Sequence, residues 1–171
     1  MRRVPIRSAL AALACLVAGT AGVRGAERDM PGLAIADFDY QDSSGEAGDQ
    51  AAAHAARLRA FVTGLRADLQ SKKHDYLTAA LPCEAQHCSA GTLTPAQLLD
   101  AAKRAGARYV LFGGIHKEST LIEWARVEMI DVSTGKLVFN QLFTFRGDSD
   151  DAWRHAEGFI ADALPYLGTS K

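Results

Sequence analysis

The sequence lacks most of the features that would place it in a specialised class of protein. Its 171 residues include only three cysteines, too few for a miniprotein held together by disulfides. Basic and acidic residues nearly balance, at 19 against 20, which argues against a general nucleic-acid binder. Hydrophobic residues make up 48% and charged residues 23%, the composition of an ordinary folded protein. The length suits one globular domain with, at most, a processing segment beside it.

The short motifs that commonly mark catalytic or cofactor sites are also missing. The sequence contains no P-loop pattern, no G-x-G-x-x-G, no G-x-S-x-G and no H-E-x-x-H. It has neither the C-x-x-C redox pattern nor the C-x-x-C-H haem signature. Most of its histidines are scattered, at His54, His74, His116 and His155. We therefore expect no catalytic residues, no cofactor and no metal.

The first 26 residues have the layout of a secretory signal peptide. Arg2, Arg3 and Arg7 form a positive start, and residues 8–23 then carry no charge. This apolar run is shorter than the roughly 20 residues that a membrane span needs. We predict a signal peptide over residues 1–26, cleaved after Ala21 or Ala26, and no stable membrane span after its removal.

A lipid anchor at Cys15 is the alternative for this segment. Lipoprotein signals prefer leucine three residues before the cysteine and a small residue two before it, and here Leu13 occupies the second place. We expect Cys15 to be one more small apolar residue of the signal. Removing residues 1–26 takes away four arginines and no acid, which leaves 15 basic and 20 acidic residues, a net charge of −5. The predicted mature protein, residues 27–171, is a mildly acidic periplasmic or secreted domain.

Hydrophobic periodicity and turn residues predict eight elements in the order β-α-β-α-β-β-β-α. The expected strands are 33–38, 76–79, 109–115, 121–132 and 136–146, and the expected helices are 51–72, 94–105 and 150–167. Residues 39–50 read as a polar loop. Ser133-Thr134-Gly135 joins two strands as a hairpin. The fold class is α/β (α+β), with helices packed on a single mixed sheet.

The same periodicity predicts which residues face the core. In the helix over 51–72 these are Leu58, Phe61, Val62, Leu65 and Leu69, and in the last helix Trp153, Ala156, Phe159, Ile160, Ala163 and Leu167. In the hairpin, Ala125, Val127 and Met129 share one face, as do Leu137, Phe139, Phe143 and Phe145. Trp124 and Arg126 lie on the opposite, outer face.

Three segments resemble a group of bacterial envelope proteins: Leu33–Phe38, Gly106–Gly114 with its "GARYVLFGG", and Asp131–Val138 with its "DVSTGKLV". The group includes the amino-terminal domain of TolB, the curli secretion lipoprotein CsgG and the penicillin-binding-protein activator lipoproteins. The resemblance covers residues 32–167, and the whole chain looks like a family of small secreted bacterial proteins of unknown function. It implies a TolB amino-terminal-like fold. A pore or a lipid-anchored role is not carried over, because the chain has an inserted cysteine segment and no convincing anchor.

That inserted segment, Cys83-Glu-Ala-Gln-His87-Cys88, is the most distinctive local pattern. Four intervening residues let the two cysteines close a small loop in an oxidising compartment, so export predicts a Cys83–Cys88 disulfide. A metal site is the alternative, with His87 as a third ligand. Zinc sites usually use a second ligand pair, and the sequence offers none.

Two further sets of residues are candidates for binding. Asp37, Asp39 and Asp42 follow the first strand, where ligands tend to bind in α/β sheets, and carboxylates there could hold a cation or act as acid and base. The alternative is a solvated acidic loop. We take Asp37 and Asp39 as candidate ligand-binding residues. Trp124 with Arg126 is a candidate interaction patch, unless a helix covers it.

These observations favour a non-enzymatic accessory protein of the periplasm or cell envelope that acts by binding a protein partner, not nucleic acid. A periplasmic small-molecule or metal-binding protein is the alternative, and a hydrolase that uses the aspartates is a third. The sequence leaves the oligomeric state open.

Overall fold

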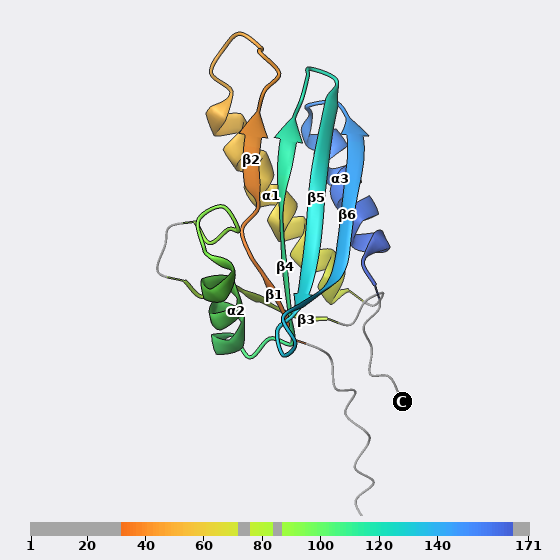
Figure 1. The fold of residues 1–171 in the computed structure, drawn as a ribbon. Coiled ribbons are helices and arrows are strands. Elements are labelled where there is room, and N and C mark those ends of the chain that lie inside the picture. Colours follow the sequence, from red (N-terminus) through yellow and green to blue (C-terminus); the bar gives the residue numbers. More distant parts are fainter. Residues whose placement is uncertain (1–31, 72–75, 84–86, 166–171) are drawn as a thin grey trace, which may run out of the picture.

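The chain forms one mixed sheet with helices on both faces (Figure 1). The computed structural model describes residues 32–71, 76–83 and 87–165. In this part of the chain the strands are β1 (Gly32–Ile35), β2 (Asp39–Asp42), β3 (Leu77–Ala80), β4 (Tyr109–Lys117), β5 (Ile122–Asp131) and β6 (Lys136–Arg146), and the helices are α1 (Ala51–Gln70), α2 (Pro95–Arg104) and α3 (Asp150–Ala163). The predicted signal peptide, Cys15 and Leu167 lie outside the described residues.

The strands lie in the order β3-β1-β4-β5-β6, and β2 also pairs with β4. Pairs of β1 with β3 and β4, and of β2 with β4, are parallel, whereas β4–β5 and β5–β6 are antiparallel. The predicted fold class is thus confirmed. The expected loop over 39–50 differs, because its first four residues form β2.

β2 continues β1 after a bulge. Ile35 lies opposite Leu111, and Asp39 lies opposite Gly114. The segment from Ile35 to Asp39 is therefore one residue longer than the β4 segment that it faces. The extra residue breaks the pairing with β4, and the Asp37 backbone N–H bonds to the Cys88 carbonyl instead. The sequence Asp-Tyr-Gln-Asp has little strand character of its own, so β2 depends on its pairing with β4.

Helices α1 and α3 cover one face of the sheet, and α2 packs on the other face (Figure 1). The main core lies under α1 and α3 and contains, among others, Phe38, Phe61, Leu65, Val127 and Ile160. A second core lies under α2, where Leu98, Ala101 and Ala102 meet Ala34 and Val110. The predicted apolar faces of the first helix and of β5 are buried in this way.

Helix starts follow local side-chain chemistry. Thr94 accepts the Gln97 backbone N–H while the Gln97 side chain accepts the Thr94 N–H, a capping box with Pro95 in the first turn. Ser149 caps α3 by accepting from the Ala152 backbone N–H. The predicted start at Thr94-Pro95 is therefore confirmed.

Two predicted core positions are wrong. Phe159 is 66% exposed, although it lies on the apolar side of α3, because its edge-to-face contact with Phe143 of the edge strand β6 leaves most of the side chain open to solvent. Leu137 is 49% exposed. The β5–β6 register passes from Met129 opposite Phe139 to Ile130 opposite Leu137, so a bulge at Val138 turns Leu137 to the outer face.

Two adjacent glycines of β4 differ in what a side chain would meet. A Cβ at Gly113 would clash with the Arg126 carbonyl oxygen of β5 and lie 2.8 Å from the Phe38 ring. At Gly114 the nearest atoms, in Asp39, lie 3.4 Å or more away. We expect Gly113→Ala to lower the free energy of unfolding by about 3 kcal/mol, because strand and core must shift. Gly114→Ala is the matched control, and urea denaturation of both variants checks the difference. Equal loss in both would contradict it.

Helices α1 and α3 approach closely where Gly64 faces Glu157. A Cβ at Gly64 would lie 2.6 Å from Glu157 Oε2, so only glycine leaves room for the carboxyl group. Burial, and the neighbouring Asp68 carboxylate, raise the pKa of Glu157 from its ordinary value of 4.5 to about 7. A carboxyl group with a raised pKa in the folded state stabilises the fold fully below about pH 4.5. That contribution falls as the pH rises to about 7.

We therefore expect Glu157→Gln to raise the free energy of unfolding by about 2 kcal/mol at about pH 8 and to leave it unchanged near pH 4. The glutamine stays neutral and has nearly the same shape. Urea denaturation at both pH values measures the difference, and Glu118→Gln, at an exposed position, is the control. A gain of equal size at both pH values would show that packing, not charge, is responsible.

Candidate functional site

The outer face of the sheet carries a hollow between β2 and β5. One row across the sheet explains it: Asp39 pairs with Gly114, and Gly114 pairs with Arg126. Because the middle position has no side chain, the larger side chains on either side enclose a cavity of about 550 Å³. Trp124 and His116 form its upper wall. We call this cavity the outer hollow. It brings the candidate residues Asp39, Trp124 and Arg126 together.

The walls of the outer hollow are held by contacts of their own. The rings of His116 and Trp124 meet edge to face at 4.6 Å, and His116 Nε2 lies 2.6 Å from Ser43 Oγ. Arg126 Nη1 donates to Asn140 Oδ1 at 3.0 Å. Trp124 is only partly covered and Arg126 is exposed, so both can meet a binding partner. No helix in the described part of the chain lies over this end of the face (Figure 1).

Exposed apolar side chains lie on β5 and β6, next to the strand row that forms the hollow. Ile122 is 39% exposed, Val138 41% and Leu142 49%. Leu142 lies directly opposite Arg126 in the β5–β6 pair. Aliphatic and aromatic groups next to an arginine are the composition that protein interfaces favour.

The carboxylates of Asp37 and Asp39 both bind the loop that holds the cysteines. Asp37 Oδ2 accepts the Cys88 backbone N–H at 2.8 Å and lies 3.5 Å from His87 Nδ1. Asp39 accepts from Ser89 Oγ at 2.5 Å and from the Gly91 N–H at 2.9 Å. Both aspartates therefore have a structural role, since they hold the segment around Cys88 against the sheet. A binding role for them stays a prediction.

The predicted disulfide between Cys83 and Cys88 is present, with Cα atoms 6.1 Å apart. Asp37 binds the backbone N–H of Cys88 itself, and Asp39 binds Ser89 and Gly91 just after the disulfide. Across the described ranges, no group of three or more histidine, cysteine, aspartate or glutamate side chains could hold a metal ion.

A buried charge cluster lies on the inner side of the sheet, at the end of β4. Lys117 has no exposed surface, and its Nζ donates to Glu46, to Gln50 Oε1 at 3.2 Å and to Asp148 Oδ2 at 2.6 Å. Asp148 also binds His54, at 3.0 Å, and Arg57 of α1. Sequence reasoning missed this cluster. The one available signal was a lysine that ends an otherwise apolar strand.

The cluster shifts the pKa of its members in the directions that strengthen it. Burial opposes the charged form of Lys117, but hydrogen bonds to Asp148 and Glu46 outweigh it and raise the pKa. The pKa of Asp148 is lowered against burial by hydrogen bonds from Lys117 and His54. Glu123, nearby and almost fully buried, has a pKa raised to about 7 by burial. Lys117 and Asp148 are thus paired within the cluster, whereas the buried carboxyl oxygens of Glu123 have no hydrogen-bond partner.

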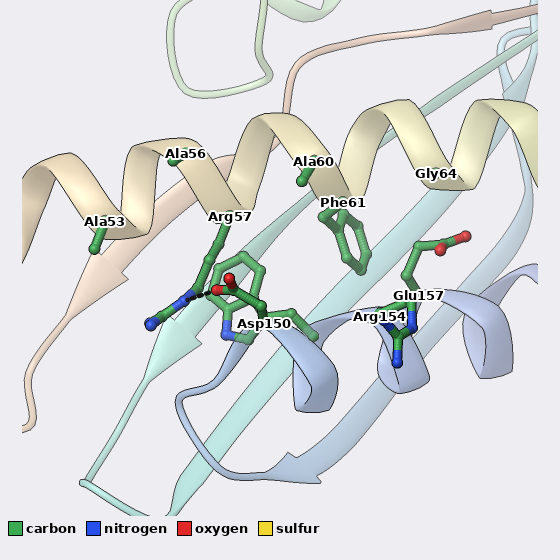
Figure 2. A pocket seen from close by; sticks show the side chains of 10 residues that line it. Ala53, Ala56, Arg57, Ala60, Phe61, Gly64, Asp150, Arg154 and Glu157 are labelled. Atoms are coloured by element: carbon green, nitrogen blue, oxygen red, sulfur yellow. Dashed lines mark hydrogen bonds and ion pairs between the residues drawn. The ribbon is translucent and has the colours of Figure 1, made fainter.

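A groove of about 670 Å³ lies between α1 and α3, away from every predicted site residue (Figure 2). The ion pair between Arg57 and Asp150 spans it at one end, and Glu157 reaches toward Gly64 at the other. Its α1 wall combines the small side chains of Ala53, Ala56 and Ala60 with Arg57 and Phe61. Sequence reasoning missed it because alanines at helical spacing indicate nothing beyond a good helix.

None of the helices in the described ranges has an apolar stretch long enough to cross a membrane.

Comparisons with solved structures show where this fold occurs. PelC from Paraburkholderia phytofirmans, solved as a dodecamer, is 16% identical with a TM-score of 0.50, over 79% of this chain and 89% of that one. TolB from Acinetobacter baumannii is 16% identical with a TM-score of 0.45, over 80% of this chain and 28% of that one. The LpoB C-terminal domain from Salmonella enterica is 15% identical with a TM-score of 0.38, over 67% and 81%. The PelC likeness shows a shared fold, and no function follows from it.

TolB and LpoB are among these structural neighbours, as the sequence resemblance implied. No curated protein matches the sequence. A family model, DUF3280, described as a protein of unknown function (DUF2380), matches residues 31–163. The chain therefore belongs to the DUF3280 family of proteins of unknown function, the kind of family that its sequence resembles.

Proposed function

We propose that this protein is exported to the periplasm and acts there as a non-enzymatic accessory protein, binding a protein partner through the outer face of its sheet. The observation that carries the proposal is the uncovered end of that face. There the outer hollow with Trp124 and Arg126 lies beside exposed Ile122 and Leu142. Aromatic and arginine side chains that meet a partner in such a setting contribute most of the binding energy of many interfaces.

The contacts of the residues around the outer hollow support binding more than catalysis. Asp39, which lines the outer hollow together with Glu128, already accepts hydrogen bonds from Ser89 and Gly91, and Asp37 accepts one from Cys88. The hollow is shallow and lies on a sheet face, and it fits a protruding side chain of a partner. Lys117, the most completely buried charge, is paired on the other side of the sheet.

A second candidate function, binding a small molecule, is favoured by the groove between α1 and α3. Its volume of about 670 Å³ falls within the range of small-molecule sites, roughly 300–1,000 Å³. Alanine, Phe61 and Trp153 give it mostly apolar walls, and Glu157 provides one polar group at its end.

The proposal that the protein is exported rests on the positively charged start and the apolar run within residues 1–26. We expect the protein isolated from the periplasmic fraction to begin at Gly22 or Glu27, with its disulfide formed. N-terminal sequencing and intact mass before and after reduction measure both. Recovery of the chain with Met1 intact in the cytosolic fraction would contradict export.

Partner binding is testable by crosslinking in cells. A photoreactive phenylalanine at Gln41, on the β2 side of the hollow, should give an adduct with another envelope protein. Arg126→Glu should lower its yield about tenfold, because a wrong charge at an interface removes at least 1.4 kcal/mol of binding.

Arg59 on α1 provides both controls. A crosslinker there should give no such adduct, and Arg59→Glu should leave the yield from position 41 unchanged, since Arg59 is exposed on the helical side. An adduct at 41 that persists in Arg126→Glu would show that the outer hollow is not the binding surface.

A further inference from the structure

In the described part of the chain, no strand covers the outer side of the edge strand β6. It ends the sheet order β3-β1-β4-β5-β6, and only β5 pairs with it among the described strands (Figure 1). Its eleven residues contain charges only at the ends, Lys136 and Arg146, and no proline or glycine. Proteins usually blunt an edge strand with charges, proline or a covering segment, because its free N–H and C=O groups recruit another strand.

The regular part of this edge is partly symmetric in side-chain type. The bulge at Val138 interrupts one end, which leaves the uncharged stretch Phe139–Phe145 centred on Leu142. Counted outward from Leu142, Phe139 corresponds to Phe145 and polar Asn140 to polar Thr144, whereas Gln141 corresponds to Phe143. An antiparallel copy therefore sets like side chains opposite each other at every pair except Gln141 with Phe143.

We propose that β6 pairs antiparallel with β6 of a second copy of this chain, about a two-fold axis at Leu142. Residues directly opposite in an antiparallel pair point to the same face, so Leu142 meets Leu142 of the second copy on the outer face. Phe139 meets Phe145 of the second copy on the inner face, and Asn140 meets Thr144. Lys136 falls outside the seven paired positions, and Arg146 lies opposite the bulge, so no like charges are opposed.

Exposure of the neighbouring α3 supports the same contact. Phe159 is 66% exposed and its ring meets Phe143 of β6 edge to face at 5.9 Å. A second copy added to β6 would bring its own Phe159 to the same side of the joined sheet and cover both rings. A foreign strand would find no charge along residues 137–145 to select it, whereas a second copy has a strand of the same length, pairs Phe139 with Phe145 and opposes no like charges.

Sedimentation velocity of the exported protein, purified as the cell makes it, tests the proposal across micromolar concentrations. We expect a dimer. Leu142→Lys places two ammonium groups at the two-fold axis and should weaken dimerisation at least about tenfold. Leu121→Lys is the matched control, because Leu121 is 68% exposed in the β4–β5 turn, and it should leave the dimer intact.

A mixture of charge variants makes the test specific for the axis. Leu142→Lys and Leu142→Glu should each dimerise at least about tenfold more weakly alone and should regain the dimer when mixed, because the two opposite charges then meet. A wild-type protein that stays monomeric, or a Leu142→Lys variant that dimerises as tightly as the wild type, overturns the proposal. Failure here is distinct from failure of the proposed function, since the crosslink from position 41 is formed on β2, away from the β6 edge, and is measured separately from the dimer.

Discussion

A buried ammonium group determines how one end of the molecule is put together. Lys117 ends β4 without any exposed surface, and a charge removed from water must be paired. Its acceptors come from separate parts of the chain: Glu46 and Gln50 from the segment before α1, and Asp148 from the connection between β6 and α3. Asp148 in turn binds His54 inside α1. If any of these segments moves away, a buried charge loses a partner, so β2, α1 and α3 are placed against β4 together.

The sequence predicted those features in which one element buries one face. Phe61, Leu65 and Leu69 recur at helical spacing, and all three are buried under α1. Val127 and Met129 alternate with outer residues, and both face the core. In each case the pattern lies within a single element, and hydrophobic burial alone decides which side turns inward. The predicted disulfide succeeded for a related reason, since its two cysteines are close in the chain.

The features that the sequence did not predict arise only between segments that are remote in the chain. β2 is polar and forms because β4 offers it backbone partners, and Leu137 turns outward because one extra residue at Val138 shifts the pairing. The outer hollow has the same origin, since Asp39, Gly114 and Arg126 share a row only through the register of three strands. Side-chain type indicated Asp39 and Arg126 as candidates, but no local pattern predicted that a glycine between them would open a cavity.

The lengths of the helices explain why one face of the sheet stays open. At about 1.5 Å per residue, the 20 residues of α1 extend about 30 Å. The nine residues of β4 extend a similar distance at about 3.3 Å each. The ten residues of α2 extend only about 15 Å, and the capping box at Thr94 fixes where they start. α2 therefore covers about half of the opposite face, and no helix in the described part of the chain covers the remainder, where Trp124 and Arg126 of β5 lie (Figure 1).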